Sequence, residues 1–137
     1  MCEDGCRRLS SGGGGGGGGG AIRLASPVSI TVTRVGAILA NGGRGGTGQV
    51  NGGGGSGGVI YLAAPEIAVY GALSVAPGPG AVSSHRGGSG GLGRIRLSVD
   101  PVRCEVTGTS NPPVPTGCAP SPDGGVPGQA YVGVWPN

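Results

Sequence analysis

The chain has 137 residues, of which 36 are glycine and 12 are proline, so only a minority of positions can supply side chains to a core. The net charge is +3, all nine basic residues are arginine, and these are scattered along the chain, which argues against a nucleic-acid-binding protein. No run of apolar residues approaches the length that a membrane-spanning helix requires.

Residues 1–20 form a glycine-rich N-terminal segment that ends in nine consecutive glycines. The stretch MCEDGCRRLSS before them lacks the apolar region of a signal peptide. The first repeat follows the glycines directly, with nothing to cap it. We therefore expect that Met1 is not the natural start and that the chain is the C-terminal piece of a longer exported protein, the other interpretation being a cytosolic protein.

Three segments of the chain align with one another: AIRLASPVSITVTRVGAILANGG (21–43), VIYLAAPEIAVYGALSVAPGPG (59–80) and RIRLSVDPVRCEVTGTS (94–110). Apolar residues alternate with others at the start of each segment, which is the period of a strand with one buried face. The successive copies are separated by 38 and then 35 residues. The aliphatic residues expected to point inward and stack are Ile22, Leu24, Ile60, Leu62, Ile95 and Leu97.

Proline and glycine mark the corners of each repeat. A proline ends the first strand, because a missing N–H does least harm at a corner. A second alternating stretch follows, and a glycine then turns the chain again. The first two copies continue into a third short strand. The corner residues are Pro27, Pro65 and Pro101, followed by Gly36, Gly71 and Gly108.

This pattern predicts an all-β fold. Three short strands in a unit of about 36 residues favour a short parallel β-helix, or β-solenoid, of about two to three coils over residues 21–110. The alternative is an antiparallel β-meander or sandwich in which the corner glycines form hairpin turns. Residues 111–137 are proline-rich and are expected to be a tail or cap.

Two glycine-rich tracts, residues 42–58 and 77–93, connect the repeats on one side of the predicted solenoid. They are interpreted either as disordered loops or as extended segments that pair through backbone hydrogen bonds in a polyproline-like layer.

The strings GGGGSGG, AIRL and the ANGG-type strand ending resemble the glycine-rich repeats of large secreted or surface-anchored proteins of GC-rich bacteria. The resemblance covers about residues 11–110. It implies an extracellular or cell-surface solenoid and says little about function.

Cys104 and Cys118 bracket a loop of prolines and glycines that can curl back, so we expect them to form a disulfide. Such a bond suits an oxidising compartment. Cys2 and Cys6 either pair or stay free. A zinc site is not expected, because paired C-x-x-C knuckles are missing, and no cofactor is indicated.

Charged and aromatic residues offer weak candidates for binding. Arg23, Arg94 and Arg96 recur at equivalent places in the repeat and are interpreted as a solvated strand face or as an anionic-glycan stripe. Tyr61 and Tyr70 point outward from their strands, where sugars could stack. The acidic candidates are the corner residues Glu66, Asp100 and Glu105.

No catalytic constellation stands out. His85 lies in SSHRGG without a positioned acid or an elbow motif, and the six acids show no motif spacing. We therefore expect a non-enzymatic extracellular structural or adhesive repeat module, with cell-surface glycans or neighbouring repeats of the same protein as partners. The alternative is a glycan-binding or glycan-active β-helix acting as a hydrolase or lyase. An ice- or mineral-binding face is disfavoured because the outward residues do not repeat one chemistry.

Overall fold

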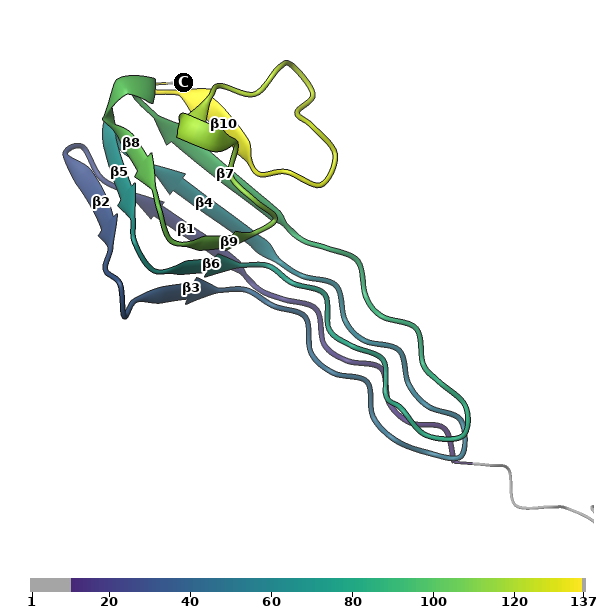
Figure 1. The fold of residues 1–137 in the computed structure, drawn as a ribbon. Helices are drawn as coiled ribbons and strands as arrows, with labels where there is room; N and C mark the ends of the chain where they lie inside the picture. Colours follow the sequence, from purple (N-terminus) through teal and green to yellow (C-terminus); the bar gives the residue numbers. More distant parts are fainter. Residues whose placement is uncertain (1–10, 137) are drawn as a thin grey trace, which may run out of the picture.

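The computed structural model describes residues 11–136, which form a three-sided β-solenoid continuing into a long glycine-rich stalk (Figure 1). All pairs between named strands are parallel, so the predicted parallel solenoid is confirmed and the antiparallel alternative is wrong. The strands are β1 (Ala21–Ala25), β2 (Ser29–Val32), β3 (Ala37–Leu39), β4 (Val59–Ala63), β5 (Glu66–Val69), β6 (Ala72–Ser74), β7 (Arg94–Val99), β8 (Cys104–Val106), β9 (Thr109–Asn111) and β10 (Tyr131–Val134).

Three turns of chain build three sheets, each turn contributes one strand to each sheet, and β10 adds a fourth strand to the first sheet. The first sheet has the order β1-β4-β7-β10, the second β2-β5-β8 and the third β3-β6-β9. Two short 3-10 helices, η1 (Pro101–Arg103) and η2 (Thr116–Cys118), complete the regular structure of the described residues.

Aliphatic residues stack inside the solenoid in the predicted register. In the first sheet Ile22, Ile60 and Ile95 are direct neighbours across the strands, as are Leu24, Leu62 and Leu97. Ile60 and Leu62 in the middle turn are completely buried, whereas Leu24 in the first turn is 41% exposed. The first turn therefore has the right side chains for the core but has no neighbour on its outer side within the described residues.

Glycine is required at the corners of the second and third turns because the turns stack there backbone on backbone. A Cβ at Gly71 would lie within 3.0 Å of the carbonyl of Gly36, and one at Gly108 would meet that of Gly71 in the same way. The predicted proline corners lie directly after β1 and β4, and Pro101 opens η1 after β7.

The third turn has a third strand that the sequence analysis did not predict, and this strand differs from its counterparts in the first two turns. The sequence analysis gave a third strand only to the first two repeats, but β9 is such a strand in the third repeat. Ser110 of β9 lies in register with Leu73 of β6, so a small polar residue replaces the aliphatic one that the pattern requires. Alternation of apolar residues could not reveal a strand that lacks them.

The C-terminal residues cover the end of the solenoid. Val114, Cys118, Ala130 and Val132 pack against the core. The strand β10 extends the first sheet beyond β7, and Val132 on it is fully buried, while Val134 is 51% exposed. The predicted disulfide between Cys104 and Cys118 is present and ties this cap to β8.

Five extended segments form the glycine stalk: residues 12–20, 41–48, 50–58, 75–81 and 87–93 (Figure 1). They run alternately toward and away from the solenoid. Segment 50–58 is central, because its backbone bonds to all four of the others. Of the two interpretations of the glycine tracts, the structure therefore has hydrogen-bonded extended segments and not loops without structure.

The stalk hydrogen bonds repeat every three residues, which is the period of the polyproline II conformation. The amides of Gly13, Gly16 and Gly19 donate to the carbonyls of Val50, Gly53 and Ser56 at 2.7–2.8 Å. At 3.1 Å per residue the nine glycines of segment 12–20 extend about 28 Å. The stalk is thus an ordered bundle held by backbone contacts.

Residues other than glycine occupy the outward positions of segment 41–48. Asn41, Arg44 and Thr47 are spaced by three residues and are all exposed. The inward positions of this segment have no room for a side chain: a Cβ at Gly42, Gly45 or Gly48 would lie within 3.0 Å of a backbone atom of a neighbouring segment.

Asn51 fixes the turns at the far end of the stalk. Its side-chain oxygen accepts a hydrogen bond from the amide of Gly48 at 3.2 Å, and its amide nitrogen donates to the Ala81 carbonyl at 3.3 Å and to Ser83 Oγ at 2.8 Å. One buried side chain thus joins the two turns in which the segments reverse.

We predict that Gly55→Ala destabilises the protein by about 1–3 kcal/mol, whereas Gly17→Ala changes stability by less than about 1 kcal/mol in either direction. A Cβ at Gly55 would overlap the backbone of Gly17, but a Cβ at Gly17 meets nothing within 4 Å. Urea denaturation of the two variants is the measurement. Equal effects would mean that the stalk is not closely packed in solution.

We also predict that reducing the bond between Cys104 and Cys118 lowers the free energy of unfolding by roughly 3 kcal/mol, because it closes a loop with a sequence separation of 14 residues. Denaturation with and without a reductant measures this loss. A chain with both Cys104→Ala and Cys118→Ala is the control and should not respond to the reductant. A similar response in the control would assign the effect to the other cysteines.

Candidate functional site

The outer face of the first sheet carries alternating arginine and tyrosine side chains. Because Ile22, Ile60 and Ile95 point inward, the residues that follow them point outward. Their register across the strands is continuous: Arg23 lies beside Tyr61, Tyr61 beside Arg96, and Arg96 beside Tyr131. We call Arg23, Tyr61, Arg96 and Tyr131 the arginine–tyrosine ladder.

The guanidinium groups of the ladder lie over the tyrosine rings. The guanidinium carbons of Arg23 and Arg96 are 5.5 and 5.6 Å from the centroid of the Tyr61 ring, and that of Arg96 is 5.0 Å from the centroid of Tyr131. All three distances lie in the range of a cation–π interaction. Since Arg23 and Arg96 come from the strands on either side of Tyr61, the Tyr61 ring is flanked on both sides.

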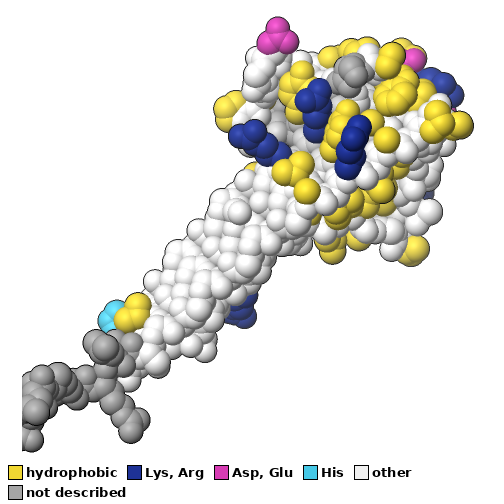
Figure 2. All heavy atoms as spheres, turned by 180° about the vertical axis from the view of Figure 1, so that it is seen from behind, with side chains coloured by type: hydrophobic (Ala, Val, Ile, Leu, Met, Phe, Trp, Pro, Cys, Tyr) yellow, Lys and Arg dark blue, Asp and Glu magenta, His cyan; other side chains and the backbone are white. Residues whose placement is uncertain are grey.

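A cleft of about 730 Å³ opens beside the ladder, between β7 and the loop that precedes β10. Arg94, Arg96 and Tyr131 line it, together with Gln129 and the apolar side chain of Val126. No carboxylate lines the cleft among the residues that the structure describes. In Figure 2, arginine side chains stand among hydrophobic ones on the solenoid, while the stalk presents mainly backbone.

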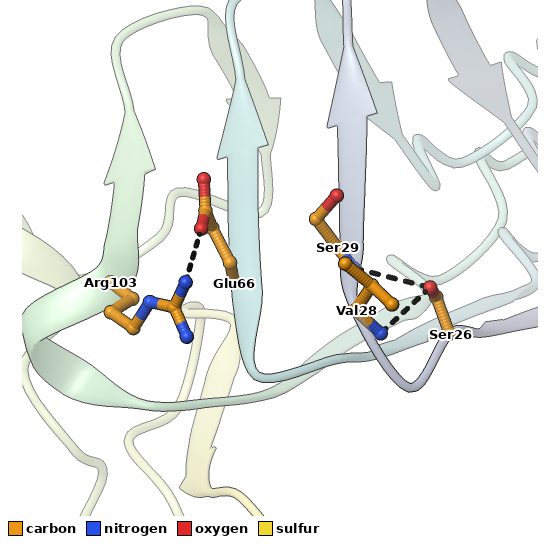
Figure 3. A network of polar contacts seen from close by, with 5 residues as sticks. All are labelled: Ser26, Val28, Ser29, Glu66 and Arg103. Atoms are coloured by element: carbon orange, nitrogen blue, oxygen red, sulfur yellow. Dashed lines mark hydrogen bonds and ion pairs between the residues drawn. The ribbon is translucent and has the colours of Figure 1, made fainter.

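The outer face of the second sheet is a separate polar region in which charges are paired. Arg103 Nη2 donates to Glu66 Oε2 at 2.8 Å, and the two side chains are about half exposed (Figure 3). The same view shows Ser26 Oγ accepting hydrogen bonds from the amides of Val28 and Ser29 at the corner before β2.

Tyr70 and Glu105 interact on this second face. The Tyr70 hydroxyl donates to Glu105 Oε2 at 3.1 Å. This hydrogen bond, with the negative charge of Glu105, raises the pKa of Tyr70 above its ordinary value of 10.0. Glu66, Tyr70, Arg103 and Glu105 surround a shallow, open depression. Glu66 and Glu105 are thus engaged by Arg103 and Tyr70, and Asp100 accepts a hydrogen bond from the Val102 amide at the start of η1.

His85 lies in the exposed turn at the far end of the stalk. Ser84 Oγ is 3.3 Å from His85 Nδ1, and both residues are exposed. No group of three or more metal-ligating side chains occurs within residues 11–136. In the same part of the chain, no helix has the length and apolar character to cross a membrane.

The structure therefore divides the predicted binding residues between two faces. It brings Arg23, Arg94, Arg96 and Tyr61 together on the first sheet, and it places Tyr70 and Glu66 on the second.

The sequence analysis did not include Tyr131 among the candidate site residues. A signal for it was present, because Tyr131 follows Arg96 by 35 residues, the same step that separates the second and third repeats.

Comparison with known proteins gives no relative: no protein-family model, curated protein or solved structure matches the chain. Functional argument therefore rests on the chain's own residues.

We predict that Glu105→Gln lowers the pKa of Tyr70 toward 10.0, because it removes the charge that favours the protonated phenol. In the native protein this interaction stabilises the fold below pH 10 and is lost as the pH rises through the raised pKa of Tyr70. Ultraviolet absorption of the phenolate follows the titration, and Tyr70→Phe assigns its signal. A titration curve that Glu105→Gln leaves unchanged would contradict the assignment.

Proposed function

We propose that the chain is a non-enzymatic structural module of an extracellular repeat protein, in which the stalk and the solenoid together form a rigid spacer. The observation that carries the proposal is that one repeat builds both parts at once. Each added coil supplies one strand to each of the three sheets and two further segments to the glycine stalk.

The two ends of the solenoid differ in a way that supports stacking on neighbouring repeats. The C-terminal end is covered by buried side chains such as Cys118 and Val132. At the opposite end Leu24 is 41% and Leu39 54% exposed, and β1, β2 and β3 each have an edge without a partner strand among the described residues. Open parallel edges beside exposed aliphatic residues suit a further coil of the same type.

The disulfide supports an extracellular location. Cys104 and Cys118 join the last coil to the cap, and such bonds persist in oxidising compartments. The stalk is held mainly by backbone hydrogen bonds, which suits a spacer exposed to solvent on all sides.

Glycan binding is the second candidate function. The arginine–tyrosine ladder and the adjoining cleft favour it, because they gather charged and polar groups on one face. A spacer that binds glycans is an adhesive module, so the two functions are compatible.

Duplicating residues 21–58 tests the proposed repeat function. The 38-residue insert repeats the step from Ile22 to Ile60 and so adds one coil in register. We predict that the longer chain unfolds in a single transition with a higher midpoint and a steeper dependence on denaturant, because each coil adds an interface.

An insert of equal length and composition with a shuffled order is the matched control, and it should leave the midpoint unchanged or lower it. Preferential proteolysis of the duplicated coil, or behaviour equal to that of the shuffled insert, would contradict the proposed repeat function.

A further inference from the structure

We propose that the arginine–tyrosine ladder and its cleft bind an acidic polysaccharide through the carboxylates of its sugars. This inference deepens the proposed function, because it assigns a ligand class to an extracellular module. It rests on the charge of this face, on the availability of the guanidinium edges and on the covered faces of the tyrosine rings.

The arginines of this face have no carboxylate partner within residues 11–136. The ion pair that the structure contains there joins Arg103 to Glu66 on the second sheet. Arg94 and Arg96 lie two residues apart on β7, and both are exposed, as is Arg23 on β1. The ladder and cleft therefore present three uncompensated positive charges on one face.

The stacking over tyrosine prepares the guanidinium groups for carboxylates. A guanidinium that lies over a ring keeps its N–H groups at its edge, where they can bind a carboxylate with two parallel hydrogen bonds. The ring also restricts the long arginine side chain before a ligand arrives, so less conformational entropy is lost on binding.

The covered rings disfavour ligands that bind by stacking. Tyr61 has a guanidinium on each side, and Tyr131 has Arg96 on one side, while a Cβ at Gly125 would lie 3.4 Å from its ring. The bases of single-stranded nucleic acids stack on open aromatic faces, and sugars that bind by stacking need the same access. Recognition on this face therefore depends on charge and hydrogen bonds.

The spacing of the charges suits a polymer that carries repeated charges. Arg23 and Arg96 are two strands apart, which is roughly 10 Å in a β-sheet. The cleft continues from Arg96 to Arg94 and Gln129, and its volume of about 730 Å³ is that of a small-molecule site. A chain that fills the cleft and follows the ladder makes several contacts at once, so its affinity exceeds that of one acidic sugar.

Calorimetric titration tests the inference with polygalacturonate as the acidic probe and dextran as the neutral one. We expect polygalacturonate to bind, with an affinity that falls as salt is added, and dextran not to bind. Arg96→Gln should weaken binding at least about tenfold, because it removes a charged hydrogen-bond donor from both the ladder and the cleft. Arg96→Lys should weaken binding less, since it keeps the charge but loses the bidentate geometry.

Arg44→Gln is the matched control, because it removes the same charge from an exposed position on the stalk. It should change the affinity by no more than about twofold. Arg23→Gln is a second variant at the opposite end of the ladder and should also weaken binding. Thermal unfolding of each variant checks that the fold is retained.

Several results would overturn the inference: no binding of polygalacturonate, equal binding of dextran, or equal losses in Arg96→Gln and Arg44→Gln. Single-stranded DNA that binds as tightly as polygalacturonate would indicate a nucleic acid ligand instead. Coil duplication is read from the stability of the chain without ligand, so its outcome does not depend on binding at this face. If polygalacturonate does not bind but the duplicated coil stabilises the chain, only the ligand assignment is wrong. If polygalacturonate binds but the duplicated coil does not stabilise the chain, only the proposed repeat function is wrong.

Discussion

Close packing of glycine backbones is the interaction on which the rest of this structure depends. The stalk segments approach so closely that a Cβ at Gly16, Gly55 or Gly78 would overlap the backbone of a neighbouring segment. Glycine loses more backbone freedom on folding than any other residue, so each segment must be stabilised by its hydrogen bonds. Segment 50–58 meets this requirement by bonding to four neighbours. The many glycines are thus a steric requirement of the bundle.

The stalk and the solenoid depend on each other through their shared connections. Every stalk segment continues directly into a strand or follows one, so the register of the strands sets the register of the stalk. Ile60 and Leu62 fix the middle turn in the core, and Gly57 and Gly58 immediately before them pack against Val75 and Gly20. The outer face of the first sheet can therefore carry the arginine–tyrosine ladder, whose side chains are not part of the core. This division of roles separates the residues that hold the fold from those on its outer faces.

Much of the solenoid could be predicted because its core follows a simple alternation. The pairs Ile22 and Leu24, Ile60 and Leu62, and Ile95 and Leu97 indicated the fold, the residues that stack in the core and the outward position of Tyr61. The order of the glycine tracts was left open, although the spacing of Asn41, Arg44 and Thr47 by three residues matches the polyproline II period. The Tyr131 contact was missed because β10 follows a long irregular loop. The sequence analysis did not identify the pairing of Glu66 with Arg103, although Asp100 followed by Pro101 is a start signal for the helical turn η1 that carries Arg103.

Site-resolved amide hydrogen exchange by nuclear magnetic resonance tests the central claim most directly. In segment 50–58 the amides of Gly52, Gly55 and Gly58 donate to neighbouring segments, whereas those of Gly53 and Ser56 have no backbone acceptor within the described residues. The account predicts slow exchange at the first three positions and fast exchange at the other two, a pattern with a period of three. Fast exchange at all five positions would mean that the glycine tracts are flexible and would contradict the rigid stalk.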